Sequence, residues 1–399
     1  MAKRINRRTF LKVAGGAAVS PWAFGQGAPQ TVGVVGGGIV GASIALHLAQ
    51  AGADVTLFEK NTPASGATSK SFAWINANNP NPHYRALRMK SMAAYRELDQ
   101  QLGLDVVWGG AIEWVSTPAE AEHLKATVQE FNSVGYPAEI IDANRMTELS
   151  PNLRLDSAHT AAFMAMDGHI DPVEVTRKFV AAAERAGARV ITSCEVRELK
   201  FQGSQLTGVE TTTGEFSLDR LVIAGGTETP TLASQAGYTP PLRHAPGILL
   251  HTTPQRPVLG RVIEASNMNI KQNPNGRLVG NDGGNPPDLS VHQEILSAVT
   301  DMPDEMKTMH GHRILNMFKE TLPGAVEASF DYLTLGYRPM PQDGYPVVGF
   351  SPSSSDVYIA VMHSGVTLAP IMGRYITHEL LSDDAVADLA PYRPERFPG

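Results

Sequence analysis

A glycine-rich turn between a strand-like run and a helical run constrains the fold of this chain more than any other feature. The β-branched run from Thr31 to Val35 is followed at once by Gly36-Gly37-Gly38-Ile39-Val40-Gly41, which opens an Ala- and Leu-rich segment. A second strand-like run, Asp54 to Phe58, ends in Glu59, which lies 18 residues after Gly41. This order and spacing are the fingerprint of a Rossmann βαβ unit that binds a dinucleotide.

Each position of the fingerprint has a physical role. Gly36 permits the tight turn, Gly38 lets the backbone approach a pyrophosphate, and Gly41 lets helix and strand pack closely. The helix N-terminus offers unpaired N–H groups and a partial positive charge to that pyrophosphate. Glu59 is expected to accept hydrogen bonds from ribose hydroxyls and to repel a 2′-phosphate, which favours FAD or NAD over NADP. A glycine-rich turn in another α/β fold is the alternative.

Length and charge narrow the classes of function. A chain of 399 residues exceeds what one hydrophobic core usually supports, so we expect two domains. The net charge of -7 gives no electrostatic reason to bind nucleic acid or an anionic membrane surface, so a small ligand is favoured. The single cysteine, Cys194, forms no intramolecular disulfide and lies in a strand-like run from Arg189 to Val196, where we expect it to pack as a small hydrophobe.

The N-terminal 28 residues have the layout of an export signal. Basic residues precede a mild apolar run from Val13 to Phe24, and the stretch from Asn6 to Lys12 resembles the twin-arginine motif through Arg7 and Arg8. The apolar run is too short to cross a bilayer stably, so no stable membrane span is expected. We therefore predict a twin-arginine signal peptide over 1–28, recognition by the twin-arginine export machinery, and a periplasmic location. A basic tail followed by a loose helix is the alternative.

Further segments, spread from about residue 31 to 380, carry a resemblance to one family. They are Ser65-Gly-Ala-Thr-Ser-Lys-Ser71, Gly168-His-Ile-Asp-Pro172, Leu221-Val-Ile-Ala-Gly-Gly226, Gly336-Tyr-Arg-Pro339, Asp343-Gly-Tyr-Pro346 with Gly349, and His363-Ser-Gly-Val-Thr367. With the fingerprint, they resemble the FAD-dependent D-amino acid oxidase superfamily, which includes glycine oxidase, sarcosine oxidase and D-amino acid dehydrogenase. The C-terminal segments are the most specific part of the match.

The resemblance implies an α/β fold in which a Rossmann-type FAD-binding domain receives an inserted α+β substrate domain with a mixed antiparallel sheet. The expected FAD-binding segments are 29–82, 150–243 and 335–399, and the expected substrate-domain segments are 83–149 and 244–334. Non-covalent FAD is expected because the stretch that matches the covalent-flavin signature lacks its His or Cys. The residues expected to contact FAD are Gly36, Gly38, Ile39, Val40, Gly41, Glu59, Lys60, Ser69, Lys70, Ser71, Ala73, Val196, Ala224, Gly225, Gly226, Gly365, Val366 and Thr367. Trp74 is expected near the flavin or, equally, in simple core packing.

The same resemblance implies oxidation of the C–N bond of a small amino acid or related amine, with oxygen or a quinone as electron acceptor. Arg338, in the Gly-x-Arg-Pro turn, is the candidate to hold the substrate carboxylate, because arginine offers two parallel hydrogen bonds in a fixed orientation. A bridge from Arg338 to a helix C-terminus or to Asp343 is the alternative. His363 is included in the predicted catalytic site.

One stretch departs from glycine oxidase. Where that enzyme places aromatic and His side chains over the flavin, Asn267, Asn269 and Lys271 share one face of a predicted strand. Asn269 and Lys271 are therefore predicted catalytic residues, and Lys271 would assist oxygen reactivity or bind a substrate anion. A solvated strand lysine is the alternative.

Two other functional classes remain open. A flavin-carrying subunit would pass electrons without a small-molecule substrate of its own, and a NAD-dependent dehydrogenase would carry no flavin. No metal site is predicted, because His310-Gly-His312 lacks a third ligand nearby and is expected to form an exposed polar turn.

Overall fold

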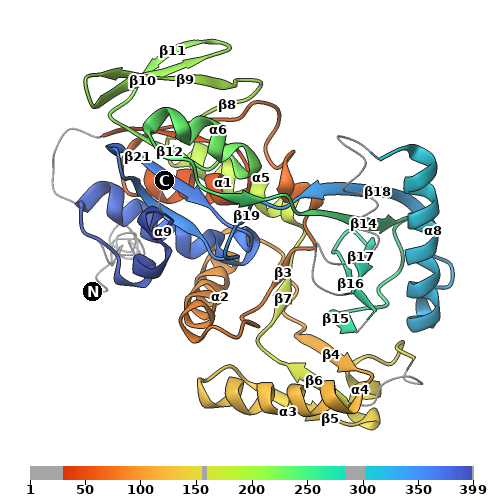
Figure 1. Cartoon of the computed structure of the whole chain (residues 1–399). Coiled ribbons are helices and arrows are strands. Elements are labelled where there is room, and N and C mark those ends of the chain that lie inside the picture. Colours follow the sequence, from red (N-terminus) through yellow and green to blue (C-terminus); the bar gives the residue numbers. More distant parts are fainter. Residues whose placement is uncertain (1–29, 155–159, 266, 284–301, 398–399) are drawn as a thin grey trace, which may run out of the picture.

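The fold is built on two large β-sheets (Figure 1). The computed structural model describes residues 30–154, 160–265, 267–283 and 302–397. The predicted signal peptide therefore lies outside the described residues. No helix in the described ranges is long and apolar enough to cross a membrane.

The first sheet contains the βαβ unit predicted from the glycine turn. Within the described chain its strand order is β20-β21-β12-β1-β2-β8. Among the described strands of this sheet, only β20 and β21 pair in antiparallel fashion, so the remainder is the parallel sheet of a doubly wound fold. The strands are β1 (Thr31–Val35), β2 (Asp54–Phe58), β8 (Arg189–Ile191), β12 (Arg220–Ile223), β20 (Val347–Ser351) and β21 (Ser354–Val361).

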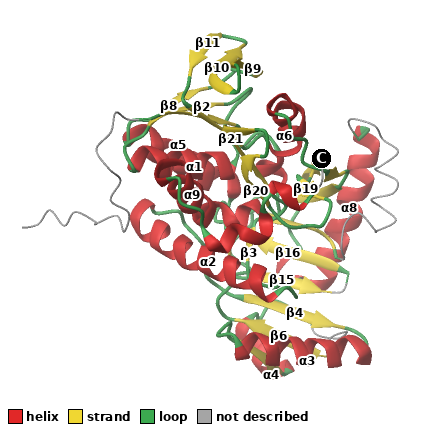
Figure 2. Cartoon of the chain, turned by 60° about the vertical axis from the view of Figure 1, so that its left-hand side comes forward, coloured by secondary structure: helices red, strands yellow, loops and turns green. Residues whose placement is uncertain are grey.

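Alternating side chains bury both faces of this sheet. Val222 of β12 packs with the helices on one face, whereas its neighbours Leu221 and Ile223 pack on the other. That alternation is expected because successive side chains of a strand point to opposite faces. One face is covered by α1 (Ile39–Gln50), α5 (Pro172–Arg185) and α9 (Gly365–Ser382), and the other by α6 (Thr229–Ala233) and a small sheet of β9 (Val196–Gln202), β10 (Gln205–Thr211) and β11 (Gly214–Ser217) (Figure 2).

The second sheet is mixed and mostly antiparallel, as the resemblance implied. Its order among the described strands is β18-β14-β17-β16-β15-β4-β6-β5. One face packs on α8 (Asp304–Thr321), where Ile263 and Ile270 share a core cluster with Ile314 and Phe318. The strands are β4 (Ala111–Val115), β5 (Ala138–Ile141), β6 (Thr160–Met164), β14 (Pro246–Thr252), β15 (Val262–Ala265), β16 (Met268–Gln272), β17 (Leu278–Asp282) and β18 (Phe330–Tyr337).

Shorter elements connect the two sheets. Two-stranded ribbons are formed by β3 (Trp74–Ile75) with β7 (Gly168–His169) and by β13 (Leu242–Arg243) with β19 (Met340–Pro341). Helices α3 (Pro118–Ser133) and α4 (Ala143–Leu149) lie at the far end of the second sheet (Figure 2). Helix α2 (Pro82–Leu102) packs against α9, and its Tyr95 hydroxyl donates to the Val366 carbonyl at 2.6 Å. The domain boundaries given above stay a prediction.

Two local expectations were wrong. The run from Arg189 to Val196 is not one strand: β8 ends at Ile191, Cys194 lies in the connection, and Val196 begins β9 in a different sheet. Cys194 is nevertheless buried, as expected for a small hydrophobe. The pair His310 and His312 lies within α8 rather than in an exposed turn, and His310 is buried because its face of the helix packs on the second sheet.

Candidate active site

A cavity of about 980 Å³ lies where the two sheets meet. Its wall includes the glycine turn after β1, the segment 65–74, the end of β12, the start of α9 and residues of β14, β17 and β18. Segments far apart in the sequence therefore enclose one space, at the carboxyl ends of parallel strands where doubly wound proteins bind nucleotides.

The glycine turn is too tight for side chains. Gly36 has φ +105°, and a Cβ there would lie 2.5 Å from the Ala224 carbonyl oxygen. A Cβ on Gly41 would lie 2.0 Å from the Gly36 carbonyl oxygen. Gly41 therefore packs helix against turn and is not part of the cavity wall, whereas Gly36 and Gly38 are.

Two helix N-termini meet the cavity without a side-chain cap. In the described structure neither Gly38 before α1 nor Ser364 before α9 makes a side-chain capping hydrogen bond. Uncapped N–H groups, together with the helix dipole, favour negative charge beside both helix starts, which lie next to each other in the cavity wall. The Ile39 amide is the partial exception, because it donates to Thr68 Oγ1 at 3.1 Å.

Glu59 is fixed at the end of β2. Its Oε2 accepts from the Gly37 amide at 2.7 Å and its Oε1 accepts from the Asn61 amide at 2.8 Å. The carboxylate is buried and lines the cavity beside the glycine turn. Because each oxygen has a second lone pair, the carboxylate can also accept from hydroxyl groups of a bound ligand.

Arg338 brings a cation to the opposite part of the wall. Its Nη1 donates to the Pro246 carbonyl, and the guanidinium lies directly over Gly247, where a Cβ would be 2.3 Å from Nη2. Arg338 forms no ion pair with any described residue, and Asp343 pairs with Arg396 instead, at 2.8 Å. Burial lowers the pKa of Arg338 to about 10, so the group stays charged at neutral pH. The predicted alternative of a bridge to Asp343 is therefore excluded.

His363 lines the same cavity and stays neutral. Burial, followed by the charges of Arg338, Arg88 and Arg243, lowers the pKa of His363 to about 4. A neutral imidazole there can donate or accept one hydrogen bond but adds no charge.

Trp74 is held in the cavity wall from two sides. Its indole Nε1 donates to Asp167 at 2.9 Å, and its carbonyl accepts from Thr367 Oγ1 at 3.1 Å. Asp167 also accepts from the Tyr136 hydroxyl. Burial raises the pKa of Asp167 to about 7, and the two donated hydrogen bonds act in the opposite direction.

Lys271 and Asn269 lie next to the cavity but are not among the described residues that line it. Lys271 is fully buried, donates to the Ile170 carbonyl and lies 5.8 Å from the centre of the Phe72 ring, which does line the cavity. Burial lowers the pKa of Lys271 to about 7. The alternative of a solvated lysine was therefore wrong, because the segments around Phe72 and Ile170 cover this strand.

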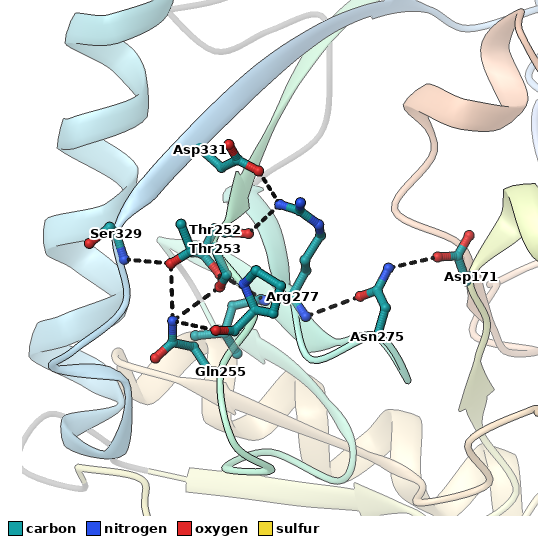
Figure 3. Close-up of polar contacts among 10 residues, drawn as sticks. Asp171, Thr252, Thr253, Gln255, Asn275, Arg277, Ser329 and Asp331 are labelled. Atoms are coloured by element: carbon teal, nitrogen blue, oxygen red, sulfur yellow. Dashed lines mark hydrogen bonds and ion pairs between the residues drawn. The ribbon is translucent and has the colours of Figure 1, made fainter.

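The turn between β16 and β17 is anchored to the start of α5 (Figure 3). Asn275 Nδ2 donates to Asp171, the N-cap of α5, at 3.2 Å, and Arg277 donates to the Thr252 carbonyl at 2.7 Å and to Asp331. These contacts fix the hairpin that carries Lys271 against the Rossmann part of the molecule.

Comparison with known proteins decides the family. The family model described as FAD dependent oxidoreductase matches residues 31–379. The chain belongs to this family. The superfamily expected from the sequence motifs is confirmed, as are the flavoenzyme class and FAD as its cofactor.

Relatives of this FAD-dependent oxidoreductase match it over more than nine tenths of its length. It is 25% identical to "Glycine oxidase" of Geobacillus kaustophilus, over 92% of this chain and 97% of that one. It is 26% identical to "4-methylaminobutanoate oxidase (formaldehyde-forming)" of Paenarthrobacter nicotinovorans, over 92% of this chain and 45% of that protein. Among solved structures, the glycine oxidase from Geobacillus kaustophilus (TM-score 0.80, 24% identity, 93% and 100% covered) and the L-proline dehydrogenase from P.horikoshii (TM-score 0.80, 22% identity, 92% and 98% covered) share the fold.

The residues at the cavity fit FAD. The turn at Gly36 to Gly38 and the N-terminus of α1 form a cradle that a Cβ would fill, as a pyrophosphate requires. Glu59 suits the ribose, and the N-terminus of α9 offers N–H donors to a flavin at the other end. Of the residues predicted to contact FAD, only Gly41 and Ser69 are absent from the described cavity wall.

Several described wall residues were not predicted from the sequence. They include Thr68, Asn76, Arg88, Gly247, Leu249, Asn281 and Tyr337. Tyr337 and Thr68 lie inside motifs that were recognised, so their neighbours could have indicated them. Arg88, Gly247 and Asn281 lie in ordinary helix or strand runs, and only the tertiary packing brings them to the cavity.

Proposed function

We propose that this enzyme oxidises the C–N bond of a small amino acid or related amine that carries a carboxylate. Bound FAD would supply the two-electron acceptor, taking a hydride at flavin N5. The substrate Cα–H bond would break, its nitrogen would lose a proton, and a C=N bond would form. The names of the relatives, which include glycine and 4-methylaminobutanoate oxidases, support this substrate class.

The position of Arg338 carries the proposal. A guanidinium with one N–H group on the Pro246 carbonyl and no ion-pair partner among the described residues retains further donors for a bound carboxylate. Gly247 beneath it leaves the space that the guanidinium occupies. A carboxylate fixed by two hydrogen bonds also fixes the direction of the neighbouring Cα–H bond, and such positioning supplies much of the rate in reactions of this kind.

Substitution of Arg338 tests the proposal. We expect Arg338→Ala to lower kcat/KM by on the order of 100-fold or more while the purified protein keeps its yellow flavin colour, because a charge-assisted pair of hydrogen bonds is lost. Gly247→Ala should displace the guanidinium of Arg338 and raise KM, so that kcat/KM falls in this variant as well. Arg256→Ala, at an exposed position, and Gly260→Ala, whose Cβ would meet no atom within 4 Å, are matched controls.

The outcomes separate the two flavin-based functions. Unchanged turnover in Arg338→Ala would contradict the substrate role of Arg338. A flavin-loaded wild-type protein that oxidises no amine would favour a flavin-carrying electron-transfer protein. A protein purified without flavin, which also fails to bind added FAD, would contradict the cofactor assignment.

Finer features belong to the same proposal. Non-covalent FAD, oxygen or a quinone as acceptor, and delivery to the periplasm by the twin-arginine machinery are supported by sequence motifs alone. For Lys271, the proposed role in oxygen reactivity is supported by a buried amine whose pKa lies near 7 and which lies close to cavity-lining Phe72.

A further inference from the structure

A row of polar side chains crosses the second sheet on the face opposite α8. The register pairs Asn281 of β17 with Asn269 of β16, Asn269 with Glu264 of β15, and Glu264 with Glu113 of β4. Directly paired residues of neighbouring strands point to the same face. We call Asn281, Asn269, Glu264 and Glu113 the polar row. It starts at the cavity, because Asn281 lines the cavity wall.

Three acceptor oxygens of the polar row have no donor. Asn281 Oδ1, Asn269 Oδ1 and Glu264 Oε2 are closed off from solvent and make no hydrogen bond with any described residue. Buried polar atoms are nearly always hydrogen-bonded, because a buried acceptor without a donor loses the hydrogen bonds that it makes in water. Three such acceptors on adjacent strands therefore indicate a ligand that brings donors.

The space above the polar row also contains an unpartnered side chain from the other part of the fold. His169 of β7 is fully buried, and neither ring nitrogen has a partner in the described structure. His169 interacts electrostatically with Lys271, which lies two residues after Asn269 on the same face of β16. Asp167, two residues before His169, interacts in the same way with Glu264. The segment 167–169 thus covers the polar row.

The charges around the polar row favour a cation. Glu113 and Asp167 lie close enough to Glu264 to raise its pKa, Glu113 also raises the pKa of Asp167, and neither glutamate forms an ion pair within the described chain. The charge of His123 acts on the pKa of Glu113 in the opposite direction. Burial, then the charges of Glu113 and Asp167, raises the pKa of Glu264 to about 8. A positive group from a ligand would favour the ionised carboxylate and relieve this repulsion.

We propose that the polar row is a subsite for a second, cationic group of the substrate, so that the substrate is an amino acid with a basic side chain. This inference rests on the proposed function, since Arg338 would hold the carboxylate of the same molecule. The Arg338 guanidinium lies over Gly247 of β14, and β14 is three strands from β15, so at about 4.8 Å per strand Gly247 and Glu264 are about 14 Å apart across the sheet. A lysine-like substrate, with its four-carbon stem, bridges that distance together with the Arg338 and Glu264 side chains.

A substrate panel with the flavin-loaded enzyme tests the subsite. The panel holds both enantiomers of lysine, ornithine and arginine, their uncharged counterpart norleucine, and glycine and sarcosine. We expect kcat/KM for lysine to exceed that for norleucine by about tenfold or more. In Glu264→Gln, which keeps the shape and removes the charge, this ratio should fall about tenfold. Glu215→Gln, at an exposed position of β11, should leave the ratio unchanged.

The results distinguish failure of the cationic subsite from failure of the proposed amine oxidation. Oxidation of glycine or norleucine in preference to every basic amino acid would overturn the subsite and leave the proposed function intact, whereas no amine oxidation at all would overturn the proposed function. An unchanged lysine-to-norleucine ratio in Glu264→Gln would also overturn the subsite. If Glu264→Gln does not fold, two measurements on the wild-type enzyme test the subsite instead: the lysine-to-norleucine ratio of kcat/KM and the change in the flavin spectrum on adding 1,5-diaminopentane. A ratio near one together with an unchanged spectrum would overturn the subsite.

Discussion

At the scale of single residues, His363 shows how the cavity changes the pKa of a titratable side chain. The imidazole is exposed to the cavity, and its position inside the cleft together with three arginines holds its pKa at about 4 rather than 6.5. Between these two pH values the unfolded chain binds a proton that the folded chain does not. The contribution of His363 to stability therefore falls as the pH drops from about 6.5 to about 4.

We accordingly expect His363→Asn to make the fold less sensitive to acid. As the pH is lowered from about 6.5 to about 4, the Tm of the wild type should fall more than the Tm of the variant. Thermal denaturation of the flavin-loaded protein at a series of pH values measures it, with His312→Asn, at an exposed position of α8, as control. A Tm difference that is constant over the window would contradict the neutral state of His363 in the folded protein.

At the scale of elements, the crossing of α1 and α9 sets the geometry of the cavity. Ser43 Oγ donates to the Ala369 carbonyl at 2.7 Å, and Gly373 lies so close to α1 that a Cβ would be 2.4 Å from His47 Nδ1 and 2.6 Å from Ser43 Oγ. Because both helices begin at the cavity wall, this close packing brings their uncapped N-termini to the same space.

Gly373→Ala should therefore weaken folding and cofactor retention together. The added methyl group has to displace α9 or the side chains of α1, and overpacking of this kind costs about 1–3 kcal/mol. We expect a lower Tm and faster loss of FAD on dilution, whereas Gly260→Ala should change neither. Loss of stability with unchanged FAD affinity would contradict the link between the helix crossing and the cavity.

Local sequence signals predicted the elements well where the contacts are local. The bounds of β1 and β2 agree with the sequence runs, and the glycine turn occupies the position that its spacing indicated. The burial of Lys271 and the polar row were not predictable in this way. Their environment depends on strand register and on covering segments, which bring together residues as distant as Glu113, Asp167 and Asn281. The two histidines of α8 were misjudged because their Gly neighbour suggested a turn, although the helix continues through Gly311.

At the scale of the whole molecule, the N-terminal sequence predicts where the enzyme works. The paired Arg7 and Arg8 precede the described residues and resemble the twin-arginine motif, which export receptors read as an address. Twin-arginine export carries proteins that have already folded, which suits a flavoenzyme whose cavity is closed by distant segments.

Replacement of Arg7 and Arg8 by Lys should stop export while leaving the enzyme folded. We expect flavin-loaded protein to accumulate in the cytoplasm and to disappear from the periplasmic fraction, measured by cell fractionation and immunoblotting. Substitution of Lys3 and Arg4 is the matched control, since these residues lie outside the motif. Export at the wild-type level by the Arg7/Arg8 variant would contradict the prediction.

The placement of β21 has a consequence for biosynthesis. This strand lies between β12 and β20, and it leads directly into α9, so the last quarter of the chain supplies an internal part of the sheet and one wall of the cavity. A nascent chain still held in the ribosomal exit tunnel lacks that wall. Flavin loading is therefore expected only after α9 has left the exit tunnel, and products that end before α9 are expected to be colourless and to be cleared by proteases.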